Sequence, residues 1–422
     1  MKILVSIILA ICGLFASVGS AFAQTWTQTS APSNHWISIA ASADGTKLAA
    51  AAGLGDSIFI STNSGVTWVQ TSSPTNNTWD AIASSADGSK LVAVAESGSI
   101  YLSTNSGITW TLADAPDAGW GSVASSADGT KLAAVAPYTY AGLNNFAVIY
   151  TSTDSGTTWI QQTNTDTPFL IQPSWVSIAS SADGTKLVVV GGLRTYFSTN
   201  SGANWMETGT RLGPSSLASP SQIIASSADG KKWAAAFFGI YSGISSVRPP
   251  IYTTTNSGDT WTVTSAPSNA WSYISMSADG NKIAAVAEGS SPTDATSIYT
   301  STDFGVTWTS NNLPAQVYRC VTFSADGSKL WAGSYGDAGV MNGGGIYTLQ
   351  ITPSPQLNLA SSGGNLTASW ILPSTNFVLQ ESADLSNWTD ITDAPALNST
   401  NLQDEVILSP TNSGGFYRLK TP

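Results

Sequence analysis

Histidine and cysteine are almost absent from this chain of 422 residues. It has one histidine, His35, and two cysteines, Cys12 and Cys320. A zinc site or a Ser-His-Asp triad depends on histidine, and His35 lies in the ordinary connection "SNHW". Cys12 falls in the apolar N-terminal run, which leaves Cys320 without a partner for an internal disulfide. We therefore expect no catalytic residues, no metal and no cofactor.

Basic residues and long apolar runs are also scarce. Asp and Glu number 26 against 15 Lys and Arg, a formal net charge of −11. Phosphates repel such a chain, so nucleic acid and anionic membranes are poor partners. The only long apolar run opens the chain, "MKILVSIILAICGLFASVGSAFA", and its one Lys and final Ala-Phe-Ala are typical of a secretory signal peptide rather than a membrane anchor. We expect residues 1–23 to be removed, leaving a secreted monomer with no membrane insertion.

A repeat dominates the remaining sequence. The tetrapeptide Ser-Ala-Asp-Gly occurs seven times at spacings of 41 to 55 residues, with its aspartates at Asp44, Asp87, Asp128, Asp183, Asp229, Asp279 and Asp326. That spacing is typical of one four-stranded propeller blade. In the second unit, "WDAIASS" predicts a strand, "ADGS" a tight turn and "KLVAVA" a second strand. "SIYLST" and "TWTLA" predict two more strands.

A second motif recurs between the third and fourth strands. "STNSGVTW" (61–68) has five relatives, among them "STDSGTTW" (152–159) and "STDFGVTW" (301–308). The seventh unit has no such box, but "TWTQTSAPSN" (25–34) at the N-terminus matches "TWTVTSAPSN" (260–269), which follows a box. We therefore predict that the N-terminus supplies the outer strand of the last blade and closes a seven-bladed ring.

These boxes resemble the Asp-box (BNR) repeat of sialidase-like propellers, and the whole unit is similar to the seven-bladed photosystem II assembly-factor family. The resemblance covers about residues 25–352 and implies that the box is a structural hairpin away from the binding face. Asn replaces the usual Asp in four boxes, at Asn63, Asn105, Asn200 and Asn256. Either side chain has an oxygen that caps the turn, so the predicted fold is unaffected.

Three segments follow from this organisation. Residues 1–23 are the signal peptide, residues 24–352 the propeller and residues 353–422 a separate module. The C-terminal segment loses the repeat, shows short alternating strands and resembles a small β-module common in secreted bacterial proteins. The fold class is therefore all-β, a closed seven-bladed propeller plus a small module similar to a β-sandwich.

Fourteen of the sixteen tryptophans lie in the propeller, at two fixed positions in most blades. One set follows the box and the other, which includes Trp36, opens the first strand. Repetition at a fixed place favours packing between blades over a sugar-binding ring. The strand-opening set leaves both interpretations open, because it lies nearer the mouth of the ring.

The candidate site is on the face opposite the uniform turns, where connection lengths vary. The longest connections are 137–147, 162–174, 207–221, 237–250 and 334–345. Seven residues before each turn aspartate, the residue type also varies, and these positions are expected to ring the mouth of the tunnel. We predict a binding centre there, made of Trp36, Asp80, Gln222, Ser272 and Arg319, with Asp80 and Arg319 reaching one polar ligand.

The sequence thus favours a secreted, non-catalytic propeller that binds a protein or a carbohydrate on its loop-rich face. A sialidase needs three arginines, a Tyr nucleophile with a Glu partner and an Asp acid, and the arginines here lack that family's surrounding sequence. A divergent sialidase-like glycoside hydrolase remains one alternative. A purely structural surface repeat protein remains another.

Overall fold

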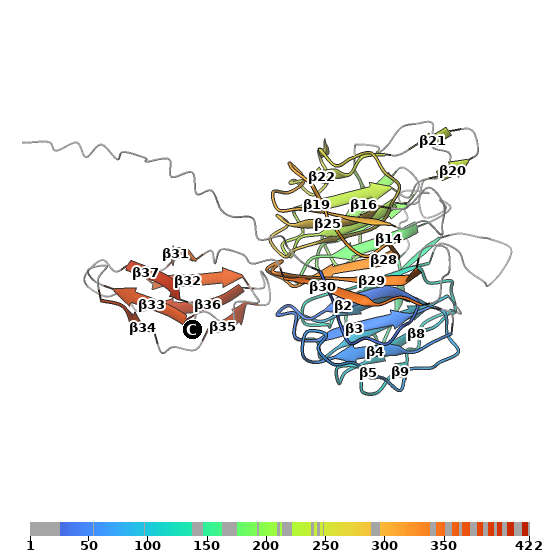
Figure 1. Ribbon diagram of the computed structural model, residues 1–422, viewed down its shortest axis with the longest axis horizontal. Coiled ribbons are helices and arrows are strands. Elements are labelled where there is room, and N and C mark those ends of the chain that lie inside the picture. The colour runs from blue at the N-terminus through green and yellow to red at the C-terminus, as the bar shows by residue number, and fades with distance from the viewer. Residues whose placement is uncertain are drawn as a thin grey trace, which may run out of the picture.

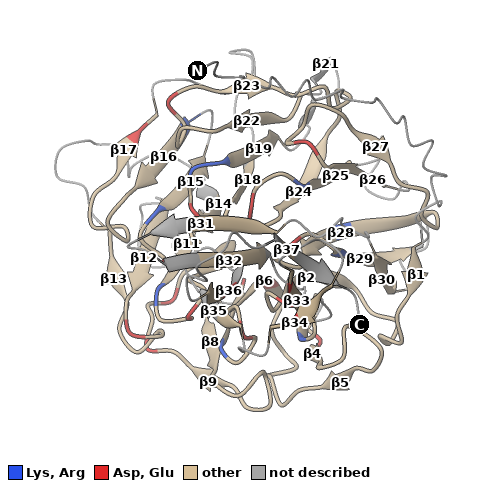
Figure 2. Cartoon of the chain, turned by 90° about the vertical axis from the view of Figure 1, so that its left-hand side faces the viewer, with Lys and Arg blue, Asp and Glu red and all other residues tan. Residues whose placement is uncertain are grey.

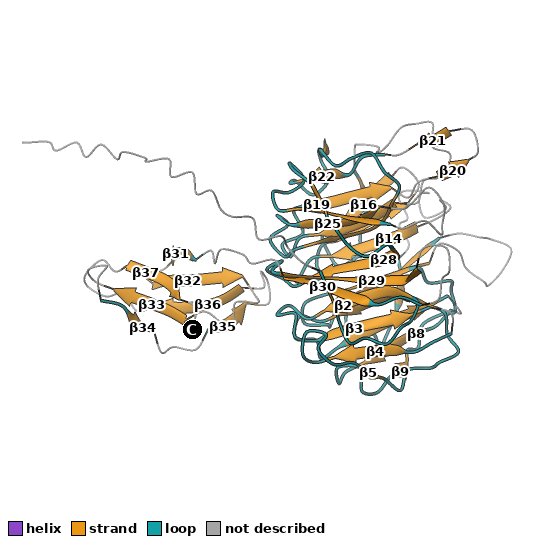
Figure 3. Ribbon diagram, viewed as in Figure 1, coloured by secondary structure: helices purple, strands orange, loops and turns teal. Residues whose placement is uncertain are grey.

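The computed structural model is built from strands alone over the residues it describes, and none of these is helical (Figure 3). The described residues are 26–53, 55–96, 98–136, 147–162, 175–191, 194–208, 212, 222–237, 240–242, 245–247, 249–287, 296–337, 343–350, 357–362, 365–371, 378–382, 387–391, 395–398, 403–408 and 416–420.

Seven four-stranded antiparallel sheets form the blades of a propeller (Figures 1 and 2). Within blades 1 to 6 the strands run from the inside outward in chain order. Blade 1 contains β2 (Trp36–Ala41), β3 (Leu48–Ala52), β4 (Ile58–Ser61) and β5 (Val69–Gln70). Blade 2 contains β6 (Trp79–Ser84), β7 (Leu91–Ala95), β8 (Ile100–Ser103) and β9 (Thr111–Leu112). Blade 3 contains β10 (Ser122–Ser125), β11 (Leu132–Ala136), β12 (Val148–Ser152) and β13 (Ile160–Gln161).

The next three blades repeat this arrangement. Blade 4 contains β14 (Trp175–Ser180), β15 (Leu187–Gly191), β16 (Arg194–Ser198) and β17 (Met206–Glu207). Blade 5 contains β18 (Gln222–Ser226), β19 (Trp233–Phe237), β22 (Tyr252–Thr254) and β23 (Thr262–Val263), with the hairpin β20 (Ile240–Ser242) and β21 (Ser245–Val247) between its second and third strands. Blade 6 contains β24 (Trp271–Met276), β25 (Ile283–Ala287), β26 (Ser297–Ser301) and β27 (Thr309–Ser310).

The two ends of the propeller meet in blade 7. Its inner three strands are β28 (Gln316–Phe323), β29 (Lys329–Asp337) and β30 (Ile346–Gln350), and its outer strand is β1 (Thr27–Gln28). Thr27 pairs with Thr348, and a second bridge joins Asn34 to Gly344. The prediction of seven blades closed by an N-terminal strand is therefore confirmed.

The Ser-Ala-Asp-Gly turns are held by their own side chains. In blade 2, the Ser85 hydroxyl donates to Asp87 Oδ1 at 2.6 Å, and the backbone N–H of Ser89 donates to the same oxygen at 2.9 Å. Gly88 takes a φ of +66°, a conformation that glycine adopts without strain. These bonds close the turn between the first and second strands.

The core lies between the blades. The second strand of each of the first six blades, such as β7, is buried along its whole length. Its apolar side chains alternate between the two neighbouring blades, so each sheet is covered on both faces. Tryptophans fill part of the space between neighbouring blades: the ring of Trp68, the last residue of the first box, lies 6.3 Å from that of Trp36.

The two kinds of turn lie on one side of the ring, here called the turn face. Within blade 1, the N–H of Ser64 in the box donates to the carbonyl of Thr46 in the Ser-Ala-Asp-Gly turn, at 2.8 Å. The opposite side, here called the loop face, carries the connections from second to third strands and between blades. It includes the hairpin β20–β21, at the right of Figure 1. The predicted division into a turn face and a loop face is confirmed.

Beyond the propeller, two further sheets pack on a shared core. One contains β31 (Asn358–Ser362), β32 (Asn365–Ile371), β35 (Ala396–Asn398) and β36 (Gln403–Leu408), and the other contains β33 (Val378–Ser382), β34 (Thr389–Asp390) and β37 (Phe416–Lys420). Trp370 of the first sheet and Leu379 of the second belong to one buried cluster. This two-sheet packing agrees with the expected small sandwich. The boundaries at residues 352 and 353 stay predictions.

Candidate functional site

The clearest chemical cluster on the loop face lies where the ring closes, between blades 7 and 1. Tyr335, near the loop-face end of β29, packs edge-on against His35, with ring centroids 4.6 Å apart. The guanidinium of Arg319, on β28, lies 6.0 Å from the centroid of the same ring. All three side chains are half-buried. We call His35, Arg319 and Tyr335 the closure cluster.

Local structure explains why these residues meet. The chain before blade 1 is tied to blade 7 by reciprocal backbone hydrogen bonds between Asn34 and Gly344, at 3.0 and 2.7 Å. The carbonyl of His35 accepts a bond from the N–H of Gly53 at 2.8 Å, which fixes the backbone at the entry to β2. β29 spans nine residues, while second strands in blades 1 to 6 span five, so Tyr335 extends far enough to reach His35.

A second polar group on the loop face contains two carboxylates. Asp80, the second residue of β6, is half-buried, and burial together with the charge of Glu96 raises its pKa from 3.8 to about 7. Burial disfavours the charged form, and a neighbouring negative charge adds to that effect. Asp80 therefore exchanges its proton near neutral pH.

Asp80 and Arg319, which the sequence grouped together, have different neighbours in the structure. Asp80 has Glu96 as its charged neighbour, and Arg319 is not among the groups that shift the pKa of Asp80. Arg319 instead lies over Tyr335 in the closure cluster. That Asp80 and Arg319 converge on one ligand stays a prediction.

The prediction that Trp36 belongs to the binding centre does not agree with its burial. Its side chain is 0% exposed, in a cluster with Ile39, Cys320 and Trp331, so its ring offers no surface to a ligand. The other strand-opening tryptophans whose side chains are described are buried in the same way, and their indole N–H groups donate to carbonyls of the preceding blade. The bonds run from Trp79 to Asp56, from Trp120 to Gly98 and from Trp271 to Pro249, at 2.9 to 3.2 Å.

The two remaining predicted residues lie at the start of the innermost strands of blades 5 and 6. Gln222 opens β18, where its backbone pairs with Phe237, and its side chain is outside the described residues. Ser272 is the second residue of β24, and its hydroxyl is enclosed without a hydrogen-bond partner. The five long variable connections also lie mostly outside the described residues.

Sequence reasoning missed His35 and Tyr335. "SNHW" was interpreted as an ordinary connection, and Tyr335 was part of a variable loop. Their only signal was compositional, since His35 is the single histidine of the chain and stands directly before a first strand. Their meeting depends on ring closure, which brings together segments some 300 residues apart, and no local pattern encodes it.

One trio on the rim combines residue types that sialidases use. Arg194 donates to Glu207 at 2.7 Å in an ion pair, and the Tyr196 hydroxyl donates to Glu207 at 3.1 Å. Tyr196 is only 1% exposed, and burial raises its pKa. A buried tyrosine that holds its proton more tightly is a poor nucleophile, so this trio fits a structural role on the outer strands of blade 4.

The described residues contain no group of three or more His, Cys, Asp or Glu side chains placed to hold a metal ion. They also contain no helix long and apolar enough to cross a membrane.

The fold defines the chain as a seven-bladed β-propeller. It matches no protein-family model and no curated protein. Among solved structures it is similar to YCF48 bound to a D1 peptide (TM-score 0.52, 13% identity, 78% of this chain and 95% of the other). It is also similar to YCF48 from Cyanidioschyzon merolae (0.52, 14%, 77% and 98%) and to an ancestral GH74 enzyme (0.53, 14%, 83% and 54%). At these identities the likeness concerns the fold.

Proposed function

We propose that this protein is a secreted, non-catalytic propeller that holds a segment of another protein against its loop face, with the closure cluster at the centre. The observation that carries this proposal is the proximity of the Tyr335 ring to both His35 and Arg319. Tyrosine and arginine are enriched among the residues that contribute most to protein interfaces. The guanidinium offers hydrogen bonds to backbone carbonyls or carboxylates, and the tyrosine ring offers flat apolar area.

Two further points support a protein as the ligand. The similar fold of YCF48 has been solved with a peptide bound. The closure cluster also combines the His35 imidazole and the Arg319 guanidinium with the Tyr335 ring on a rigid scaffold. These side chains therefore lose little conformational entropy when a ligand binds. A carbohydrate is the second candidate, because an aromatic ring flanked by polar groups also suits a sugar.

The test is a selection of peptides from a random library on the chain that begins at Gln24, followed by affinity measurement. Tyr335→Ala and Arg319→Ala are expected to weaken the selected peptides at least about tenfold, as loss of an interface anchor does. Arg194→Ala, on the rim of blade 4, is the matched control and should leave affinity unchanged. Peptides that bind all variants equally would place the site elsewhere on the molecule.

Parallel measurements separate the alternatives. Binding on a glycan array that depends on Tyr335 would replace the protein ligand by a carbohydrate. Turnover of fluorogenic glycosides by the purified protein would establish the hydrolase. Secretion is tested by N-terminal sequencing of the exported protein, which should start at Gln24.

A further inference from the structure

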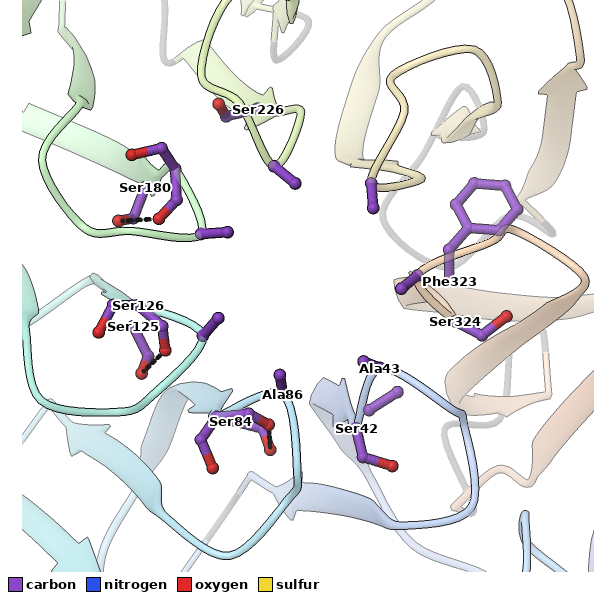
Figure 4. A pocket seen from close by; sticks show the side chains of 18 of the residues that line it. Ser42, Ala43, Ser84, Ala86, Ser125, Ser126, Ser180, Ser226, Phe323 and Ser324 are labelled. Atoms are coloured by element: carbon purple, nitrogen blue, oxygen red, sulfur yellow. Dashed lines mark hydrogen bonds between the residues drawn. The ribbon is translucent and has the colours of Figure 1, made fainter. Parts of the chain in front are cut away.

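A cavity of about 190 Å³ opens on the axis of the propeller at the turn face, opposite the closure cluster (Figure 4). Its rim is formed by the alanines of the seven Ser-Ala-Asp-Gly turns. Each of these alanines donates its backbone N–H to the carbonyl of the alanine in the next blade, at 2.7 to 2.8 Å, and the series closes from Ala325 back to Ala43. The rim is therefore a rigid hydrogen-bonded ring, and the cavity has a fixed shape.

The lining also includes the serines of five turns, Ser42, Ser85, Ser126, Ser181 and Ser324, whose hydroxyls donate to their own turn aspartates. Besides these, one further side chain from each blade lines the wall, and these seven side chains form two arcs. Blades 2 to 5 contribute hydroxyls, and blades 6, 7 and 1 contribute apolar groups. The polar arc is Ser84, Ser125, Ser180 and Ser226, and the apolar arc is Met276, Phe323 and Ala41. At these seven positions the wall is thus polar on one side and apolar on the other.

The polar arc presents acceptors. Each of its four serine hydroxyls donates its proton to the carbonyl of the following residue, at 2.9 to 3.0 Å, as the dashed lines of Figure 4 mark for part of the arc. A serine hydroxyl has one donor and two lone pairs, so these hydroxyls retain only accepting capacity. A ligand that satisfies them must bring its own N–H or O–H groups.

The nearby lysines do not donate to these serine hydroxyls. The lysines that follow the turns point along the ring, where for example Lys131 Nζ donates to the carbonyl of Asp183 at 2.9 Å and Lys282 Nζ to that of Asp326 at 2.9 Å. None of them lines the cavity. Each of these lysines has a turn aspartate nearby, which offsets its charge. Because the whole chain carries a net charge of −11, its overall electrostatic field does not repel a cationic ligand.

We propose that this axial cavity is a binding site for a small protonated amine with a short apolar body. The ammonium group donates hydrogen bonds to the serine arc, and its alkyl part packs against Met276 and Phe323. The volume corresponds to about six water molecules, which suits a ligand of five or six non-hydrogen atoms. The site is independent of the protein-binding surface on the opposite face.

The test uses n-butylammonium, with n-butanol and butyrate as isosteric comparators, titrated into the chain that begins at Gln24 and followed by ligand-observed NMR and calorimetry. Saturable binding of butylammonium is expected, with butanol at least tenfold weaker and butyrate without binding. Equal binding of the ammonium and the alcohol, or no binding of either, would overturn the proposal and leave a cavity that holds only water.

A matched pair of variants tests the location. Ser125→Thr keeps the hydroxyl and adds a methyl group, whereas Ser125→Val has a second methyl group in place of that hydroxyl, at nearly the same volume as Thr. Both are combined with the same change at Ser180. The valine pair should lose at least tenfold in butylammonium affinity and the threonine pair should retain it. Melting curves confirm that both pairs are folded. Equal affinities in two folded pairs would show that the amine binds elsewhere.

Discussion

At the scale of single residues, the boxes show that Asn and Asp form equivalent hydrogen bonds in the same turn. In blade 3, Asp154 Oδ1 accepts the N–H of Thr158 and Oδ2 accepts its hydroxyl. In blade 2, Asn105 Oδ1 accepts the N–H of Thr109, while Asn105 Nδ2 donates to the Thr109 hydroxyl. The hydroxyl rotates from donor to acceptor, so the turn keeps its bonds without a charge.

Replacing Asn105 by Ala removes three hydrogen bonds of this turn, including one from the Ser103 hydroxyl at 3.0 Å. We expect the free energy of unfolding to fall by about 0.5–2 kcal/mol, as for loss of a helix-capping side chain. Urea denaturation measures the change. Asn105→Asp is the control and should be close to neutral at pH 7. Peptide binding on the loop face should not change in either variant.

Asp80 makes stability depend on pH. Its folded pKa of about 7 lies above the ordinary value of 3.8, so between these values the folded state binds more protons than the unfolded state. Stability from this group is present at low pH and is lost as pH rises from about 4 through 7. Asp80→Asn should therefore be more stable than wild type at pH 8 and similar to it at pH 4.

Thermal melts across this pH range measure the difference. Glu96→Gln is the matched variant, because removal of the Glu96 charge lowers the folded pKa of Asp80. The loss of stability should then be smaller and should end at a lower pH than in wild type. An unchanged difference between Asp80→Asn and wild type from pH 4 to pH 8 would contradict the assigned pKa.

At the scale of elements, the turns of neighbouring blades interlock. Gly184 has a φ of +64°, and a Cβ built on it would lie 2.8 Å from the Cβ of Lys131 and 2.9 Å from that of Ser126, both in the preceding blade. The lysine stem thus packs into the space that glycine leaves open. Glycine is required there by both conformation and contact.

Gly184→Ala should lower the free energy of unfolding by more than about 1 kcal/mol, since alanine at positive φ is strained and its methyl group collides with the neighbouring blade. Ser201 provides the comparison, because this box serine also has positive φ, 58°, and Gly is compatible with it. Ser201→Gly should change stability by less than about half as much in the same denaturation experiment. A Gly184→Ala protein as stable as wild type would show that the turn adapts.

Features formed within one blade could be predicted from the sequence, whereas sites formed across several blades could not. The strands and turns could be predicted because Asp87-Gly88 and its six equivalents specify hairpin turns locally, and each blade repeats them. Trp36 was assigned to the mouth because position along a strand does not reveal which neighbour covers a side chain. The axial cavity was missed because it needs Ser125, Met276 and Phe323 from three different blades to converge. Sites made by convergence across the ring have no local signature.

At the scale of the whole molecule, three sets of contacts close the ring at blade 7. Ala325 bonds to Ala43 at the axis, Lys329 Nζ donates to the Ser64 hydroxyl at 3.1 Å, and β1 pairs with β30 at the outer edge. Tyr273 of blade 6 reaches past Cys320 to the Ser38 hydroxyl of blade 1, and burial raises its pKa to about 12. Closure is therefore shared between the axis and the rim, and the rim part depends on the first residues of the propeller.

Deletion of residues 24–29 tests that part. The deletion removes β1, the backbone bond from Thr29 to Ile346 and the buried ring of Trp26, which is 8% exposed and donates to Asn311 at 3.3 Å. It also exposes the edge of β30. We expect a loss of at least about 3 kcal/mol, the typical cost of removing a buried tryptophan, and a tendency to associate through the open edge. Trp26→Ala keeps the strand and should lose stability without associating, while deletion of residues 24 and 25 alone should have little effect. A chain that begins at Ser30, melts like the full propeller and stays monomeric in analytical ultracentrifugation would show that the outer strand is dispensable and that the axial contacts alone hold the ring closed.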